Sequence, residues 1–280
     1  MWKERSKQLK VEGKTLTQIY NIVQTEYLSD LNLKQVEEKV RPILRREAKK
    51  SIEKQEVVGV ISDTHFPFVH PNYIHFLEDT FNKHKVTRIV HIGDLCDFHA
   101  ISRHQTETTA VDAVTEYNLA RAQIDLYTRA FPKVDLTLGN HCTIAVRQAA
   151  TLGIPKQFLK DFPELWGLPK GWNIHEQFIL NNVLYEHGIN WVGKHGALDK
   201  ATITMMSCVI GHSHSNGGCA YRSNAKSIVF GLNVGAGVDI SAYAFAYGRY
   251  SKNRETLGCG IVFDNANAIF VPMGGKYFRN

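Results

Sequence analysis

Apolar side chains recur at helical spacing in the first fifty residues. The segment Thr-Leu-Thr-Gln at 15–18 has the form of a capping box, and apolar Ile19, Ile22 and Val23 follow it. A second helix start, Asn-Leu-Lys-Gln at 32–35, precedes apolar residues at i, i+4 and i+8, which are Val36, Val40 and Leu44. The pattern predicts two short helices joined by a polar turn at 27–31.

Pro42 falls inside the second of these helices. We expect it to bend or interrupt that helix, because proline has no N–H to donate and its ring clashes with the preceding turn. Two short helices with a polar turn and a basic second helix resemble a helix-turn-helix. Many small helical hairpins share this pattern, so the segment 1–54 is interpreted either as a nucleic-acid-binding module or as an oligomerisation arm.

From residue 55 the pattern changes to short apolar runs rich in β-branched residues. Five such runs end at or near Gly or Ser: VVGVIS (57–62), RIVHIG (88–93), VDLTLG (134–139), VLYEHG (183–188) and CVIG (208–211). Amphipathic segments at 72–85 and 111–131 lie between the first three, which predicts βαβ units and a buried sheet. The stretches 227–235 and 258–273 look like strand pairs without helices between them, so the second half should be more antiparallel.

Composition limits the class of protein. The chain has 280 residues, of which 44% are hydrophobic and 21% charged, which fits one large α/β domain with a small appendage. No apolar run approaches the roughly 20 residues that span a bilayer, so no membrane partner is expected. The polar N-terminus does not resemble a signal peptide. The five cysteines form no C-x-x-C pair, which argues against a zinc ribbon or disulfide framework and for reduced thiols in the cytoplasm.

Positive charge is concentrated at the N-terminus. Residues 1–54 hold 13 of the 33 Lys/Arg and 8 of the 27 Asp/Glu, which is a net charge of +5 against +1 for the remainder. Such asymmetry suggests an anionic partner, and nucleic acid is the commonest. A solvated helical face is the alternative interpretation.

Polar side chains follow each of the five apolar runs directly. In chain order they are Asp63-Thr64-His65, Asp94 with Asp97, Asn140-His141, His187, and His212-Ser213-His214. In α/β sheets the loops beyond the carboxyl ends of the strands form the binding crevice, so these groups should converge on one spot. Imidazole and carboxylate together suit borderline divalent metals. Because there are too many ligands for one ion, we expect two ions roughly 3.5–4 Å apart, the arrangement used in phosphoryl chemistry.

These blocks resemble the calcineurin-like metallophosphoesterases, whose pattern is D-x-H, G-D-x-x-D, G-N-H, a lone His and G-H-x-H. All of them are present in order over residues 57–215. The resemblance implies a four-layer α/β/β/α sandwich at 55–280, with 1–54 as a helical, helix-turn-helix-like module. The helical module and the motif blocks together also resemble phage-encoded members of this family.

The resemblance also implies how the ligands divide between the two ions. One ion would take Asp63, His65, Asp94 and His214, and the other Asp94, Asn140, His187 and His212. Asp94 would bridge them. Manganese is our first choice of metal, with iron, zinc or nickel as alternatives.

His141 has no metal role in this scheme. In the family the equivalent histidine faces the leaving group, and a histidine beside two cations is a good proton donor to a departing oxygen. Asp97 would orient His141 and sustain its charged form. A helix N-cap is the alternative role for Asp97.

The chain departs from the family pattern at two places. Cys142 stands where members commonly carry an acidic residue, which puts the support of the Asn-His loop in doubt. Phe98-His99 replaces the Arg-Gly of the phosphoprotein phosphatases, which disfavours a Ser/Thr protein phosphatase. His99, Arg103 and His104 are candidate phosphate contacts, and Arg103 is preferred because guanidinium pairs bidentately with phosphate.

We therefore expect a two-metal phosphoesterase that works by metal-bridged hydroxide attack on a phosphate ester, with nucleic acid or a nucleotide as the substrate. One alternative is a general phosphomonoesterase whose N-terminal helices are an oligomerisation arm. The other is a non-catalytic nucleic-acid-binding regulator on the same scaffold. The sequence does not define the oligomeric state.

Overall fold

The computed structural model describes residues 1–52, 56–103, 110–223, 225, 227–242 and 254–277. Contacts divide the chain into two units, Met1–Gln55 and Glu56–Asn280. No helix in the described ranges is long and apolar enough to cross a membrane.

The first unit is a bundle of three helices, α1 (Trp2–Val11), α2 (Leu16–Tyr27) and α3 (Leu33–Ile52). Both expected helix starts are formed, each as a capping box. The Gln18 N–H donates to Thr15 Oγ1 at 3.3 Å and the Thr15 N–H donates to Gln18 Oε1 at 2.9 Å, while Asn32 and Gln35 exchange the same pair of bonds at 3.0 Å. Each box satisfies N–H groups that a helix start leaves without partners, which fixes where α2 and α3 begin.

Of the two expectations at Pro42, a bend or an interruption, the interruption is wrong, because α3 continues through it. Pro42 is exposed, and Val36, Val40 and Leu44 on either side of it are buried in one core with Leu9, Ile19 and Val23. This shared packing holds both halves of the helix although proline removes one backbone hydrogen bond. The sequence predicted two helices here, and α1 is a third.

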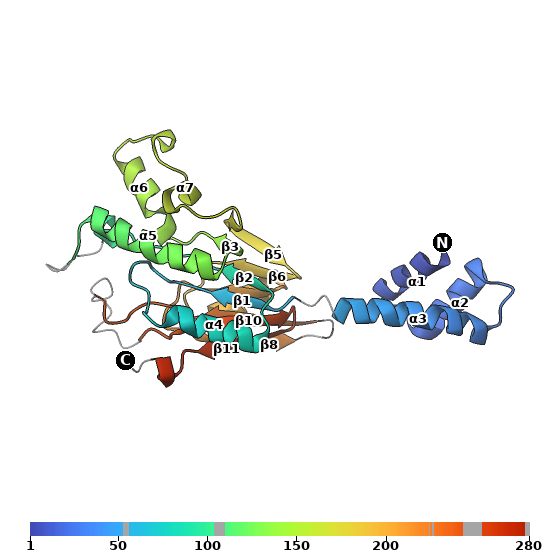
Figure 1. Ribbon diagram of the computed structural model, residues 1–280. Coiled ribbons are helices and arrows are strands. Elements are labelled where there is room, and N and C mark those ends of the chain that lie inside the picture. Colours follow the sequence, from blue (N-terminus) through green and yellow to red (C-terminus); the bar gives the residue numbers. More distant parts are fainter. Residues whose placement is uncertain (53–55, 104–109, 224, 226, 243–253, 278–280) are drawn as a thin grey trace. The chain divides into compact units, whose positions relative to one another are not determined.

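The second unit contains two mixed sheets (Figure 1). The first has the order β11-β10-β1-β2-β3-β4, and the second has the order β5-β6-β7-β9-β8. The strands of the first sheet are β1 (Val58–Ile61), β2 (Arg88–His91), β3 (Val134–Thr137), β4 (Trp172–His175), β10 (Gly258–Asp264) and β11 (Asn267–Pro272). The strands of the second are β5 (Gln177–Leu180), β6 (Val183–Glu186), β7 (Ser207–Ile210), β8 (Gly217–Ser223) and β9 (Ile228–Val234).

All five apolar runs form strands, as predicted. Strands β1, β2, β3 and β4 are parallel, and so are β6, β7 and β9. The segment 258–273 forms the predicted antiparallel pair, β10 with β11. The segment 227–235 is one strand rather than a pair, and its antiparallel partner is β8. Strand β8 was not predicted, because its sequence GGCAYRS has no apolar run and is mostly exposed.

Helices cover the outer face of each sheet. Helices α4 (Tyr73–His84) and α5 (Ala113–Ala130) pack on the first sheet (Figure 1), and α8 (Gly196–Thr204) packs on the second. The remaining helices of the described residues are α6 (Ile144–Thr151), α7 (Phe162–Trp166), and the 3-10 turns η1 (His99–Ile101), η2 (His141–Thr143), η3 (Lys156–Phe158) and η5 (Gly275–Tyr277).

The two sheets face each other across a core to which alternate residues contribute. Val58 and Val60 of β1 pack against Val209 of β7 and Phe230 of β9, whereas Ile61 packs on the helix side. Because side chains alternate across a strand, β1 buries both of its faces. The expected four-layer α/β/β/α sandwich is confirmed.

Candidate metal centre and active site

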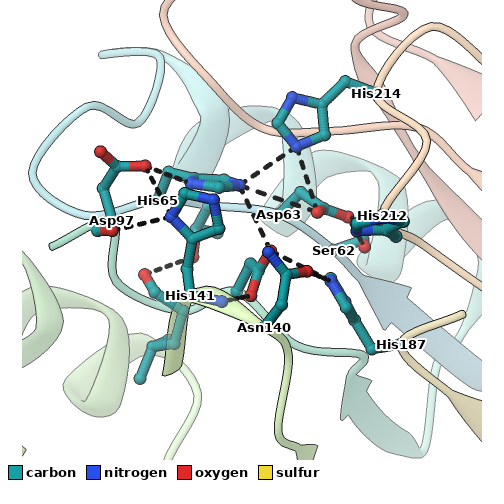
Figure 2. A network of polar contacts seen from close by, with 12 residues as sticks. Ser62, Asp63, His65, Asp97, Asn140, His141, His187, His212 and His214 are labelled. Atoms are coloured by element: carbon teal, nitrogen blue, oxygen red, sulfur yellow. Dashed lines mark hydrogen bonds and ion pairs between the residues drawn. The ribbon is translucent and has the colours of Figure 1, made fainter. Parts of the chain in front are cut away.

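Five strand ends place the candidate ligands at one edge of the sandwich. In the first sheet, Asp63 comes shortly after β1, Asp94 after β2 and Asn140 after β3. In the second sheet, His187 follows β6 and His212 follows β7. Because these strands are parallel within each sheet, their carboxyl ends share an edge. The structure brings all seven candidate ligands together there, and all of them except Asp94 are labelled in Figure 2.

Asp63, His65 and His214 form the first group of ligand atoms. His214 Nε2 lies 3.1 Å from His65 Nε2 and 3.2 Å from Asp63 Oδ1, and His65 Nε2 lies 3.7 Å from the same oxygen. Ligands that bind one cation at about 2.1 Å are separated by roughly 3–3.5 Å. The spacing therefore fits a single divalent ion.

Asp94, His187 and His212 form the second group, with Asn140 beside them. His187 Nε2 lies 3.0 Å from both Asp94 Oδ2 and Asn140 Oδ1. Asp94 Oδ2 also lies 3.8 Å from His65 Nε2 of the first group. The Asp94 carboxylate thus stands between the two groups, where a bridging ligand has to be.

Two of these histidines have their outer nitrogen held by a neighbour. His65 Nδ1 donates to Asp97 Oδ1 at 2.6 Å, and His187 Nδ1 donates to the Ile92 carbonyl at 2.8 Å. Such bonds fix the tautomer and the ring orientation of a ligating histidine. In both residues Nε2 is the atom directed at the cluster.

The carboxylates and imidazoles of the site stabilise each other's charged forms. Burial raises the pKa of the Asp94 carboxyl, but the positive charge of His187 outweighs it and lowers the pKa to about 2. Burial likewise opposes the ionised form of Asp63, yet hydrogen bonds from His214 and His65 hold its pKa well below the usual value. Burial lowers the pKa of His187, and Asp94 raises it to about 9. Without metal, this edge holds carboxylates paired with protonated imidazoles, and a cation would displace those protons.

The backbone is strained where the ligands sit. Asp63, His65 and Asp94 each have φ of 47°, and His212 has φ of 64°. Left-handed backbone in a residue other than glycine costs of order 1–3 kcal/mol and clusters at functional sites. It turns each side chain sharply off the end of its strand, toward the shared edge.

Glycines let the ligand loops approach closely. Gly93 has φ of 102°, and a Cβ on it would lie 2.5 Å from His187 Nδ1. A Cβ on Gly139 would overlap the carboxylate of Asp94. The glycines of the G-D and G-N blocks are thus required by the packing of one ligand loop on the next.

His141 and Asp97 are neighbours, as expected, but their contacts differ from the simple expectation. His141 Nδ1 donates to the carbonyl oxygen of Asp97 at 2.7 Å, and its distance to the carboxylate Oδ1 is longer, at 3.2 Å. The shortest contact of that carboxylate is the one with His65, at 2.6 Å (Figure 2). Burial lowers the pKa of His141, but the hydrogen bond with Asp97 outweighs it, so the pKa is raised. Asp97 therefore supports both a ligand and the candidate acid.

The two candidate substrate contacts have different positions. Arg103 is exposed and lines a cavity of about 450 Å³ beside Asn140 and His141. His99 is buried, with Nδ1 3.8 Å from Asp97 Oδ2, and it does not line that cavity. Its position suits support of Asp97 better than contact with substrate. His104 lies outside the described residues.

Three residues of the site were missed from the sequence. Arg147, in α6, donates to the Asn140 carbonyl at 2.9 Å and lines the same cavity as Arg103. Glu116, buried in α5, accepts hydrogen bonds from the N–H groups of His99 and Ala100 at 2.8 and 2.7 Å. Ser62 donates to the Asp63 carboxylate. Only Ser62, directly before Asp63, carried any signal, because the other two lie far from the motifs along the chain.

The loop that carries Cys142 is held without an acidic residue at that position. Cys142 is buried against Cys96. The His141 N–H donates to Asp94 Oδ1 at 2.8 Å, and Arg147 and the Thr143 hydroxyl donate to the Asn140 carbonyl at 2.9 and 3.0 Å. These hydrogen bonds hold the Asn140-His141 loop, although Cys142 replaces the acidic residue that family members commonly carry there.

No protein-family model and no curated protein matches the sequence. Among solved structures, the chain is similar to Vacuolar Protein Sorting 29 from Cryptosporidium parvum, with 11% identity, a TM-score of 0.41, and coverage of 76% of this chain and 88% of that one. For the E. coli phosphoesterase YfcE these values are 12%, 0.34, 78% and 98%. For the Pseudomonas putida nuclease MPE they are 11%, 0.34, 76% and 87%.

At such identities the comparisons concern the fold alone. In this chain the motif blocks stand in order at the ends of β1, β2, β3, β6 and β7. The resemblance to calcineurin-like metallophosphoesterases therefore rests on the chain's own motif blocks and on its two-sheet architecture.

Proposed function

We propose that the protein is a metal-dependent phosphoesterase that hydrolyses phosphate esters of nucleic acids or nucleotides. The observation that carries the proposal is the convergence of seven potential ligands from five strand ends, in two groups, with the Asp94 carboxylate of the second group 3.8 Å from His65 of the first. The donor set of imidazoles, carboxylates and one amide suits two borderline divalent ions, with manganese our first choice.

The chain's own residues have distinct tasks in this reaction. When bound, the two ions supply positive charge to the phosphate oxygens and lower the pKa of the attacking water. The oxygen of that water forms a bond to phosphorus while the bond from phosphorus to the leaving oxygen breaks. His141, held through Nδ1 by Asp97, presents Nε2 to the leaving oxygen and gives it a proton. The raised pKa of His141 keeps that proton available at neutral pH.

The first unit is proposed to contact nucleic acid. Exposed basic side chains of α3 project from a helix whose apolar residues are buried in the bundle. They are Lys34, Lys39, Arg41, Arg45 and Arg46. Arg41 pairs with Glu37. The other four form no ion pair with an acidic side chain among the residues that the structure describes. A set of basic side chains along one helix is the electrostatic pattern expected of a surface that binds phosphates.

The test is a substrate panel assayed with Mn²⁺ and with EDTA. The panel contains a chromogenic monoester, a chromogenic diester, cyclic nucleotides, and single- and double-stranded DNA. EDTA should abolish activity and Mn²⁺ should restore it. Asp94→Ala should cost more activity than any other ligand substitution, because it removes a contact to both ions. Asp161→Ala, an exposed carboxylate outside the site, is the control.

Thermal unfolding gives a readout that does not depend on turnover. Mn²⁺ at 100 times its dissociation constant should stabilise the native protein by about 2.7 kcal/mol. For a unit of this size that raises Tm by roughly 5–10 °C. Asp94→Ala should lose most of this shift and Asp161→Ala none of it. Full activity in thoroughly chelated protein would refute the proposal.

A further inference from the structure

A cavity of about 450 Å³ opens beside the candidate acid, between the turn that follows η1 and helix α6. Its volume lies within the range of small-molecule sites. Asn140 and His141 form the wall toward the metal ligands. Arg103 contributes from the η1 side and Arg147 from α6. The cavity is therefore continuous with the reaction site and contains two guanidinium groups.

The structure fixes the two walls relative to each other. Gln148 Nε2, next to Arg147, donates to the carbonyl of Ile101 at 2.9 Å, which joins α6 to η1. Glu116 holds η1 by accepting from the N–H groups of His99 and Ala100. Arg147 itself is tied to the Asn140 carbonyl through Nη2. Both arginines thus stand on backbone that is anchored to neighbouring elements.

The cavity carries positive charge and is therefore suited to bind an anion. Among the residues that the structure describes, no acidic side chain lines it, and neither Arg103 nor Arg147 forms an ion pair with an acidic residue. Guanidinium groups bind phosphate with paired, charge-assisted hydrogen bonds. Two of them around one cavity are enough to hold a phosphate monoester or diester group.

The position of the cavity beside His141 indicates which part of a substrate would occupy it. In the proposed function, on which this inference rests, His141 gives a proton to the leaving oxygen. The cavity is lined by His141, so the group attached to that oxygen has to extend into it. An anion there belongs to the leaving group and not to the phosphate under attack.

We propose that the cavity is a subsite for a second phosphate, carried by the leaving alcohol and held by Arg103 and Arg147. The preferred substrates are then phosphodiesters whose leaving nucleoside is itself phosphorylated, as at any internal linkage of a nucleic acid strand. A simple monoester or a small chromogenic diester leaves the subsite empty.

The test compares three dithymidine monophosphates that carry an additional phosphate at neither end, at the 5′ end or at the 3′ end. The measured quantity is the ratio of kcat/KM for each phosphorylated substrate to that for the unphosphorylated one, with Mn²⁺ present. One of the two isomers, the one whose phosphate lies on the leaving nucleoside, should give a ratio of about ten or more. Arg147→Ala and Arg103→Ala should each lower that ratio by about tenfold, the weight of one charge-assisted hydrogen bond.

Arg129→Ala is the matched control, because Arg129 is exposed in the last turn of α5 and does not line the cavity. It should keep the wild-type ratio. The ratio also separates the subsite from the bond between Arg147 and Asn140, because damage to the metal ligands lowers kcat/KM for all three substrates alike.

A binding measurement distinguishes failure of this inference from failure of the proposed function. Calorimetry in EDTA should show thymidine 3′,5′-bisphosphate binding to the wild type, with a dissociation constant about tenfold higher in either arginine variant. If the wild type cleaves diesters but the ratio is near one, or is unchanged in the variants, the subsite is overturned and the proposed function stands. If the bisphosphate binds through both arginines but no diester is cleaved, the role in leaving-group binding is overturned together with the proposed function.

Discussion

Replacing His141 by alanine separates acid catalysis from metal binding. The backbone N–H of His141 donates to Asp94 Oδ1 at 2.8 Å, and this bond survives the substitution because it does not involve the side chain. The imidazole contacts the carbonyl and carboxylate of Asp97 and is not one of the seven candidate ligands. His141→Ala should therefore leave metal content and the Mn²⁺-induced rise in Tm close to wild type.

The loss of turnover should depend on the leaving group. General acid catalysis contributes typically 10²–10⁴-fold, which is about 2.7–5.4 kcal/mol of transition-state stabilisation. An alkoxide leaving group, such as a nucleoside oxygen, needs the proton and should show this full loss. Nitrophenolate departs readily as an anion, so its ester should lose much less.

The assay measures kcat at saturating Mn²⁺ for a series of diesters with leaving groups of increasing pKa. The slope of log kcat against that pKa should become steeper in His141→Ala. The wild-type rate should also fall as the pH rises through the raised pKa of His141, because the acid loses its proton there, and the variant should lack this limb. His75→Ala, a histidine whose side chain is 72% exposed in α4, is the matched control.

One result would refute this reasoning. If His141→Ala slows all leaving groups by the same factor while metal binding is intact, the residue does not donate a proton in the rate-limiting step. His141 would then act by positioning the substrate.

Two further predictions concern the first unit and the buried His91. Deleting residues 1–54 should weaken binding of DNA or RNA and flatten its dependence on salt, while a small chromogenic diester is still cleaved, because all candidate ligands lie at or beyond Asp63; a changed mass by light scattering with unchanged affinity would identify an oligomerisation arm instead. Burial lowers the pKa of His91 from 6.5 to about 3, so below pH 6.5 the unfolded chain binds a proton at His91 that the native protein does not. The contribution of His91 to the free energy of unfolding should therefore fall by about 1.4 kcal/mol per pH unit toward pH 3. In urea titrations with EDTA, the stability deficit of His91→Gln relative to wild type should shrink from pH 7 to pH 5, and a deficit independent of pH would contradict this.

The sequence by itself determined five of the strands, two helix starts and the polar residues that follow those strands. Runs such as 57–62 and 88–93 predicted strands because period and β-branching are local properties of the chain. The capping boxes at Thr15 and Asn32 predicted the helix starts for the same reason. That the side chains after the strands converge follows from a general rule on parallel sheets, so the candidate metal ligands were predictable before any packing was known.

Tertiary structure decided which side chains contact one another across long stretches of chain. Asp97 was expected to serve His141, and the folded protein directs its carboxylate to His65, 32 residues away, at the shorter distance. Strand β8 has no apolar pattern and exists because β9 offers it an edge. The path of α3 through Pro42 depends on a core shared by three helices. No local pattern encodes such contacts, because they depend on the positions of elements that the chain brings together only on folding.

Arg147 is the clearest case. An arginine on a short helix outside every motif carries no signal in the sequence. Its role in the site depends on the packing of α6 beside η1. This packing brings its guanidinium into a hydrogen bond with the Asn140 carbonyl and places it in the same cavity as Arg103. The motifs determined the chemistry at the strand ends, whereas the surroundings that select a substrate were decided by the packing of helices and turns around them.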